Sequence, residues 1–339
     1  LACFGPSAGA AQLEGSKAFT KDFLARHDIP TGAYANFTEL EPALAYLREQ
    51  GAPIVVKADG LAAGKGVIVA ETLEQAEAAV TDMLSGNAFG EAGCRVVIEE
   101  FLAGEEASFI VMVDGENVLP MATSQDHKRI GDGDTGPNTG GMGAYSPAPV
   151  VDVEVYARIM VQVILATVRG MAAEGNAYTG FLYAGLMIDP RGQPKVIEYN
   201  CRFGDPETQP IMMRLQSDLV ALCEAALDGR LDSTEASWDS RCAIGVVLAA
   251  GGYPGSYAKG TAIDGLDANF GDGIKVFHAG TATDGDRVVT SGGRVLCVTA
   301  LGADIAGAQA ACYSAVNRIN WDGMTLRRDI GWRAIARYS

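Results

Sequence analysis

The sequence predicts an α/β chain of the α+β kind, assembled from short strands, capped helices and glycine-rich turns. Apolar, β-branched runs such as PIVV (residues 53–56) and GVIV (66–69) are typical of strands. The segment TLEQAEAAVTDML (72–84) is typical of a helix, because Thr72 and Gln75 form a capping box at its start. The 339 residues are enough for two or three domains with their own cores.

The other elements follow from the same signals. Ser16 precedes a helix whose apolar face carries Phe19, Phe23 and Leu24, and Pro30 closes that segment. Further along we expect strands between 95 and 123, a long amphipathic helix over 152–173, a hairpin over 179–200, a helical stretch over 206–231 and, beyond 242, short strands followed by a helix over 304–319. Residues 125–145 have almost no periodicity, so they are expected to form a long loop, of a kind that is usually functional or disordered.

Composition excludes several classes of function. The net charge of −16 disfavours non-specific nucleic-acid binding, so Lys and Arg beside glycine-rich loops are expected to act on a small anion. No apolar run approaches a membrane span, and we expect no membrane partner. Seven cysteines without a Cys-x-x-Cys pair favour reduced thiols and a cytoplasmic location. Three histidines give little support to a His-dependent hydrolase.

A glycine-rich loop with two lysines, KADGLAAGKGV, occupies 57–67. It is not a P-loop, because three residues rather than four separate Gly60 from Gly64-Lys65, and Gly66 follows where Ser or Thr is required. The loop also joins two strands, whereas a P-loop joins a strand to a helix. Its backbone N–H groups suit phosphate binding, and Lys65 is either a ligand or a solvated loop residue.

Five stretches of the sequence resemble the ATP-grasp superfamily and, within it, the phosphoribosylamine–glycine ligase family. They are EGSKAFTKDFL (14–24), KADGLAAGKGV (57–67), IEEFLAGEEASF (98–109), SQDHKRIGDGDTGPNTGGMGAYSP (124–147) and VIEYNCRFGDPETQ (196–209). The last two stretches are specific to that family, whereas the glycine-rich loop and IEEFL are shared by ATP-grasp enzymes and indicate only ATP. The resemblance implies an ATP-grasp fold of two α+β subdomains with a small, mainly β C-terminal domain.

The resemblance also implies an ATP site. It gives the phosphates to Lys17 and Lys57, the adenine to Glu99, Glu100 and the backbone of Leu102, and the ribose to Glu106. The implied ATP-binding set is therefore Lys17, Lys57, Gly60, Gly64, Lys65, Gly66, Glu99, Glu100, Leu102 and Glu106. Ordinary surface lysines, or an edge-strand pair of carboxylates, remain the alternative explanation for these side chains.

Glu198 and Asn200 alternate with Tyr199 along a predicted strand and therefore face the same side. A carboxylate and an amide oxygen are hard ligands, and the resemblance implies that they hold Mg²⁺ or Mn²⁺. Many ATP-grasp enzymes have another acidic ligand on the preceding strand, but here only Asp189 is available, at the turn.

Arg202, Asp126 and Lys128 complete the predicted catalytic set. Arg202 can grip a phosphate or a carboxylate with two parallel hydrogen bonds, unless it forms a structural salt bridge with Asp205. His127 is expected to be a positioning residue rather than a nucleophile.

The reaction implied by the resemblance joins glycine to 5-phosphoribosylamine at the expense of ATP, in purine biosynthesis. The glycine carboxylate becomes glycyl phosphate and the amine then attacks it, so no protein nucleophile is needed. Two alternatives stay open. One is another ATP-grasp carboxylate–amine ligase or carboxylase, and the other is a non-catalytic ATP-binding fragment. The resemblance implies a monomer for the full-length family member.

We expect residues 1–15 to be the remnant of a missing N-terminal domain, 16–238 to be the ATP-grasp domain with a lid over about 34–104, and 239–339 to be a C-terminal α+β domain. Full-length members of the family begin with a nucleotide-fold domain, whereas this sequence opens with LACFGPSAG.

Overall fold

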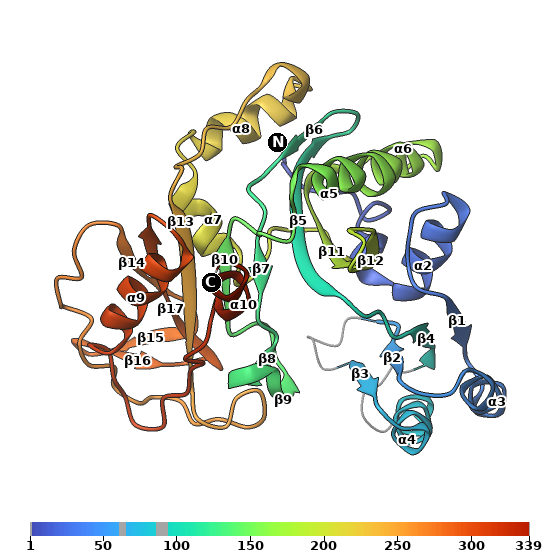
Figure 1. The fold of residues 1–339 in the computed structure, drawn as a ribbon, viewed down its shortest axis with the longest axis horizontal. Coiled ribbons are helices and arrows are strands. Elements are labelled where there is room, and N and C mark those ends of the chain that lie inside the picture. Colours follow the sequence, from blue (N-terminus) through green and yellow to red (C-terminus); the bar gives the residue numbers. More distant parts are fainter. Residues whose placement is uncertain (1, 61–65, 86–93, 339) are drawn as a thin grey trace. The chain divides into compact units, whose positions relative to one another are not determined.

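The computed structural model describes residues 2–60, 66–85 and 94–338 and divides them into two compact units (Figure 1). Unit 1 comprises 1–120, 150–202 and 223–234, and unit 2 comprises 121–149, 203–222 and 235–339. Both units are built on antiparallel sheets with helices packed against them, which agrees with the predicted α+β class.

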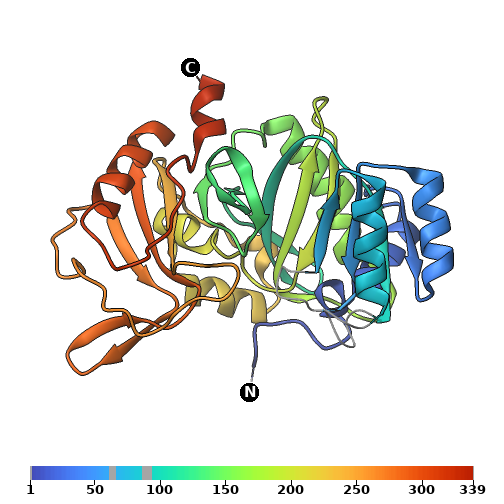
Figure 2. The same ribbon diagram turned by 90° about the horizontal axis from the view of Figure 1, so that it is seen from below.

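The first sheet of unit 1 has the strand order β1-β4-β2-β3. Its strands are β1 (Tyr34–Phe37), β2 (Ile54–Ala58), β3 (Val67–Ala70) and β4 (Val96–Glu100). Helices α3 (Leu40–Gln50) and α4 (Leu73–Leu84) cover it (Figures 1 and 2), and their apolar residues share one core with those of the strands. The predicted capping box is present: Thr72 Oγ1 accepts from Gln75 N, although Gln75 Oε1 accepts from Glu71 N rather than from the cap residue itself.

The second sheet of unit 1 has the order β12-β11-β5-β6. It comprises β5 (Glu105–Asp114), β6 (Val118–Pro120), β11 (Thr179–Ile188) and β12 (Pro194–Asn200), so the predicted 179–200 hairpin is confirmed. Two short helices precede the first sheet, α1 (Gln12–Gly15) and α2 (Lys17–Arg26). The side chain of Ser16 caps α2, as expected. The turn η4 (Leu231–Ser233) completes the unit.

The predicted long helix is present as one continuous stretch of α5 (Val153–Arg158), η3 (Ile159–Ile164) and α6 (Leu165–Ala173). Its middle turns are π-helical, and Asp152 caps its start. By length and composition alone its 21 residues could cross a membrane, with a mean hydropathy of 1.3. That corrects the expectation that no apolar run is long enough. A core helix of a globular protein passes the same test, and 44% of the apolar 18-residue window is buried inside the protein. One such helix is therefore weak evidence for a membrane span.

Unit 2 is centred on a sheet of order β14-β17-β13-β10-β7. Its strands are β7 (Gln125–Asp126), β10 (Gly143–Ser146), β13 (Cys242–Ala249), β14 (Ile274–His278) and β17 (Arg294–Gly302). Every residue of β13 after Cys242 is buried, so the sheet is covered on both faces. Ile244, Val246 and Leu248 share a core with α9 (Ile305–Val316). The alternate residues, such as Gly245, face α7 (Thr208–Arg214).

The remaining elements of unit 2 are short. They are β8 (Arg129–Gly131), η2 (Asp132–Asp134), β9 (Thr135–Asn138), β15 (Thr281–Asp284), β16 (Arg287–Thr290) and α10 (Trp332–Tyr338), while α8 (Leu219–Leu227) runs from unit 2 into unit 1.

The expectation of a long irregular loop over 125–145 is wrong. This segment contains β7, the β8–β9 hairpin and β10. Glycine and polar residues form these ladders through backbone hydrogen bonds, and such pairing produces no alternation of apolar side chains. The periodicity of the sequence therefore could not reveal it.

A buried polar cluster holds this segment to the C-terminal part of unit 2. Arg327 is completely buried, and its guanidinium binds Asp134 Oδ1 at 2.8 Å and Asp329 Oδ2 at 2.7 Å. His127 is also buried, and its Nε2 accepts a 3.0 Å hydrogen bond from Gly331 N. The ring is therefore the neutral tautomer with its proton on Nδ1, which lies 3.6 Å from Asp134 Oδ1.

The contacts in this cluster determine the charge states of His127 and Asp134. Burial lowers the pKa of His127, and the charge of Arg327 adds to that shift although Asp134 opposes it. Burial alone would raise the pKa of Asp134, but the nearby His127 ring, the hydrogen bond from Arg327 and the charge of Arg333 outweigh it and leave that pKa well below the usual value. Both groups therefore favour the folded state less as the pH falls.

We predict that the chain loses stability on acidification, in two windows. The unfolded state takes up the His127 proton below pH 6.5 and the Asp134 proton below pH 3.8, while the folded state resists both. His127→Phe should flatten the first window, and at neutral pH it should lower the free energy of unfolding by about 1–3 kcal/mol, because Gly331 N loses its acceptor. Thermal denaturation of both proteins between pH 7.5 and 5 is the measurement, and equal slopes would contradict the assignment.

Candidate active site

The carboxylate of Glu99 lies between two lysine side chains in the interior of unit 1. Lys57 Nζ is 2.9 Å from Glu99 Oε1 and 3.0 Å from Oε2, and Lys21 Nζ is 2.8 Å from Oε2. The three residues are 3%, 2% and 4% exposed in the order Lys57, Lys21, Glu99, so their charges are removed from solvent. A buried carboxylate needs such partners, because unpaired burial of a charge is prohibitively unfavourable.

The local structure explains why these side chains meet. Lys57 lies on β2 and Glu99 on the neighbouring antiparallel strand β4. Val56 pairs with Ile98 in the register of these strands, so Lys57 and Glu99 lie diagonally on either side of that pair. Glu99 and Glu100 alternate, so one points inward while the other is exposed and contacts Lys195 Nζ at 3.4 Å. Lys57 Nζ also donates to the carbonyl oxygen of Ile197 on β12, at 3.1 Å.

Lys17 lies at the start of α2, close to the glycine-rich loop. Its Nζ donates to the carbonyl oxygen of Gly60 at 3.0 Å. Asp59 anchors the helix start, because its Oδ1 accepts from Ser16 Oγ at 2.9 Å and from Ala18 N at 2.8 Å. Burial lowers the pKa of Lys17, the charge of Lys57 lowers it further, and the carboxylate of Glu198 opposes both. The ammonium groups of Lys17 and Lys57 are therefore close enough to repel each other in a partly buried region.

Glu198 and Asn200 share one face of β12, as predicted, while Tyr199 is buried on the other. Gly185 lies opposite Glu198 on β11, and a Cβ there would come within 3.2 Å of Glu198 Cγ, so the glycine makes room for that carboxylate. Within the described residues no group of three or more His, Cys, Asp or Glu could hold a metal ion. The donor set available on β12 is thus one carboxylate and one amide.

Arg202 follows this strand and is half-exposed. Its guanidinium donates to Asn200 Oδ1 at 3.2 Å and lies 3.6 Å from Glu14 Oε1 on α1. Glu14 Oε2 also accepts from the backbone N of Cys201 at 2.7 Å, so this carboxylate holds the end of the strand in place. The alternative partner considered for Arg202, Asp205, is instead bound to Arg294 at 2.5 Å.

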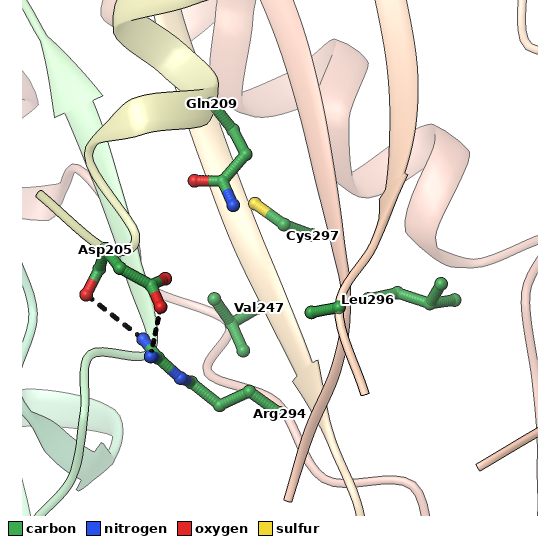
Figure 3. Close-up of a pocket in the computed structure, with 7 residues that line it drawn as sticks. Asp205, Gln209, Val247, Arg294, Leu296 and Cys297 are labelled. Carbon is green, nitrogen blue, oxygen red and sulfur yellow. Dashed lines mark hydrogen bonds and ion pairs between the residues drawn. The ribbon is translucent and has the colours of Figure 1, made fainter. Parts of the chain in front are cut away.

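Unit 2 contains a cavity of about 220 Å³ on the α7 face of the sheet (Figure 3). Asp205 and Arg294 form the ion pair at one side, while Gln209, Val247 and Cys297 line the rest. Gln209 Oε1 is buried without a hydrogen-bond partner among the described residues. Burial raises the pKa of the Cys297 thiol to about 12, so this sulfur is not a nucleophile at neutral pH.

Comparison with known proteins identifies the family. The model for the phosphoribosylglycinamide synthetase ATP-grasp (A) domain matches residues 15–208, and the model for the C domain of that synthetase matches 243–333. A phosphoribosylamine–glycine ligase of Vibrio cholerae is 76% identical over 337 residues, which are 99% of this chain and 79% of that protein. The corresponding ligase of Pseudomonas aeruginosa is 74% identical over 338 residues, again 99% and 79% of the two chains. The chain belongs to the phosphoribosylamine–glycine ligase family.

Solved structures agree with this family assignment. The crystal structure of phosphoribosylamine–glycine ligase from Thermotoga maritima superposes with a TM-score of 0.88 at 36% identity, over 96% of this chain and 81% of that one. The biotin carboxylase domain of a Hydrogenobacter thermophilus carboxylase gives 0.75 at 19% identity, over 96% and 70%, which shows a shared fold. The predicted ATP-grasp fold is therefore confirmed, and the chain is a ligase of this superfamily.

The predicted residues of this ligase family are distributed over both units. Lys17, Lys57, Glu99, Glu198 and Asn200 are brought together within unit 1, as described above. Three others also lie in unit 1: Leu102 and Glu106 are half-buried and Gly66 is buried. Asp126 and Lys128 belong to unit 2, where Asp126 pairs with Ala144 in register. Gly64 and Lys65 lie outside the described residues.

Sequence reasoning missed Lys21, Asp59, Glu14, Gln209 and Arg294. Lys21 could have been found, because it follows Lys17 by four residues on a capped helix and so shares its face. Arg294 had no such signal, since 89 residues separate it from Asp205.

We predict that Glu99→Leu destabilises the ligase far more than Lys57→Met. Leucine at 99 leaves two buried ammonium groups without a carboxylate and should cost about 3–5 kcal/mol of the free energy of unfolding. In Lys57→Met, Glu99 keeps its bond to Lys21, so no buried charge is left unpaired. Denaturant unfolding of the two variants tests this order, and a Lys57→Met protein as unstable as Glu99→Leu would contradict it.

Proposed function

We propose that the chain catalyses ATP-dependent ligation of glycine to 5-phosphoribosylamine, giving glycinamide ribonucleotide, ADP and phosphate. Membership of the phosphoribosylamine–glycine ligase family carries this proposal. The buried Lys57 near the end of β2 and the half-buried Lys17 at the start of α2 support it, because their ammonium groups form a cationic space suited to phosphates.

The chemistry needs two steps and no protein nucleophile. A carboxylate oxygen of glycine attacks the γ-phosphorus of ATP, the bond to the ADP oxygen breaks, and glycyl phosphate forms. The amine of phosphoribosylamine then attacks the carbonyl carbon, phosphate leaves, and the amine loses a proton to give the amide. Proposed roles follow from position: Lys17 and Lys57 hold the phosphates, and Arg202 at the end of β12 orients an anionic group near them.

We further propose that Glu198 and Asn200 hold Mg²⁺ or Mn²⁺. One carboxylate and one amide oxygen on a shared strand face fit a hard cation whose other ligands are phosphate and water oxygens. A cation held there would supply positive charge that neutralises the transferring phosphoryl group. Glu99, Glu100, Leu102 and Glu106 are proposed for the nucleoside. Asp126 and Lys128 are proposed for the reacting substrates.

The domain limits are proposed as 16–238 for the ATP-grasp domain, with a lid over 34–104, and 239–339 for the C-terminal domain. The two family models fall on either side of this boundary, and the sheet β1-β4-β2-β3 with its two helices lies within the lid. A cytoplasmic location and the absence of nucleic-acid and membrane partners are also proposed, supported by the composition. A monomeric state is proposed for the full-length family member, on the family resemblance alone.

The test of the function is release of ADP with glycine and phosphoribosylamine added separately and together. Ligation requires both substrates for sustained ADP release and for formation of the amide product. Other acids and amines serve as controls. Equal turnover with a different acid would favour another ATP-grasp ligase, and tight ATP binding without turnover would favour a nucleotide-binding role.

We predict that Lys57→Met weakens ATP binding about 10- to 100-fold while the protein stays folded. The lost charge-assisted contacts to phosphate correspond to about 1.5–3 kcal/mol. Titration calorimetry measures the affinity and circular dichroism checks the fold. Unchanged ATP affinity would remove Lys57 from the site.

We predict that Glu198→Gln and Asn200→Ala reduce Mg²⁺-dependent ADP formation more than ATP affinity, because the proposed cation acts mainly on the transferring phosphoryl group. Turnover at saturating Mg²⁺ should fall by about two orders of magnitude or more, given the several kcal/mol that such charge stabilisation provides. Asp189→Asn is the matched control, because Asp189 Oδ1 is engaged in the turn before β12, where it accepts 2.8 Å hydrogen bonds from the backbone N of Arg191 and of Gln193. Near-parental turnover in either strand variant would show that its residue is not a ligand.

A further inference from the structure

Lys21 is a buried ammonium outside the set of residues proposed for ATP. It projects from α2, one helical turn after Lys17, and is 2% exposed. Its Nζ has two close polar neighbours, Glu99 Oε2 at 2.8 Å and Thr31 Oγ1 at 2.7 Å. Burial lowers the pKa of Lys21, and the Glu99 carboxylate opposes that shift. Burial of a lysine is costly, so its presence calls for a reason.

The charge of the cluster suggests that reason. Lys57 and Glu99 alone would form a neutral pair, because a bidentate contact joins Lys57 Nζ to both carboxylate oxygens. A neutral pair attracts a polyphosphate only weakly. Lys21 adds a second positive charge to the same carboxylate, so two ammonium groups and one carboxylate leave a net charge of +1. In an interior without water, a net charge of +1 attracts an anion strongly over several ångströms, whereas a neutral pair does not.

We propose that Lys21 is a positioning residue for the nucleotide phosphates, which neutralises Glu99 so that Lys57 keeps a positive charge to offer them. Lys21 acts through Glu99 and does not touch the nucleotide, because its ammonium is enclosed by protein. The inference rests on the proposed function, in which Lys57 binds phosphate.

The alternative role is purely structural. Thr31 Oγ1 accepts from Lys21 Nζ and itself donates a 2.7 Å hydrogen bond to the carbonyl oxygen of Val196. Through Thr31, Lys21 therefore also connects α2 to β12. A structural clamp would affect every ligand of unit 1 equally. Charge supplied to the phosphates affects ATP but not adenosine, which has no phosphate, so the two roles can be separated.

The experiment measures ATP and adenosine affinities by titration calorimetry on the whole chain. Lys21→Met should weaken ATP binding about tenfold and leave adenosine binding within about twofold. Lys275→Met, on the exposed strand position of β14 in unit 2, removes the same charge elsewhere and should change neither affinity. Parental ATP affinity in Lys21→Met, or an equal loss for both ligands, would overturn the proposal.

A double variant tests the charge count directly. Lys21→Met with Glu99→Gln leaves Lys57 with the original net charge of +1, so the ratio of ATP affinity to adenosine affinity should return to within about threefold of the parental ratio. Because both ligands carry the nucleoside, this ratio cancels any loss of the nucleoside contact proposed for Glu99. This variant also decides the matter if Lys21→Met does not fold, and a ratio as low as in Lys57→Met would refute the proposal. Failure of the parent protein itself to bind ATP would instead refute the proposed function.

Discussion

The interior of unit 1 depends on satisfying one buried carboxylate. Glu99 is tolerated on β4 only because Lys57 reaches it from β2 and Lys21 reaches it from α2. Those contacts require the helix and the two strands to be held together, and the bond from Lys57 to Ile197 adds β12 to the same group. A buried ion cluster stabilises the fold little against an apolar replacement. It does, however, hold the ammonium groups of Lys21 and Lys57 in fixed positions.

The site needs charge and position rather than a reactive side chain. Transfer of a phosphoryl group to a carboxylate makes the electrophile, and the second substrate supplies the nucleophile. The protein has to keep anions close together and exclude water. Three features fix the positions of charged groups. They are the lysines that point into the interior, the start of α2 held by Asp59, and the glycine opposite Glu198. Burial raises the pKa of the Cys297 and Cys312 thiols, so both stay protonated at neutral pH.

Buried polar contacts also stabilise unit 2, where they hold a glycine-rich segment in place. Its glycine-rich segment cannot build an apolar core of its own, so polar contacts hold it. Arg327, buried among Asp134 and Asp329, and His127, bonded to Gly331, join the β8–β9 hairpin region to the chain near α10. Pairing with Arg327 helps to hold the pKa values of Asp134 and Asp329 below the usual value, so we expect these contacts to stabilise unit 2 less as the pH falls.

The sequence by itself determined the elements with local signals and the family. Ser16 and Thr72 cap their helices as the sequence predicts, and the alternation in β12 places Glu198 and Asn200 on one face. The sequence motifs identify the ATP-grasp superfamily. Only the tertiary structure decided which charges meet. The ladders within 125–145, the pairing of Asp205 with Arg294, and the position of Lys21 beside Glu99 depend on contacts between residues far apart in the chain. Backbone pairing and long-range ion pairs leave no periodic trace in a single sequence, because the partner is set by the packing of separate elements.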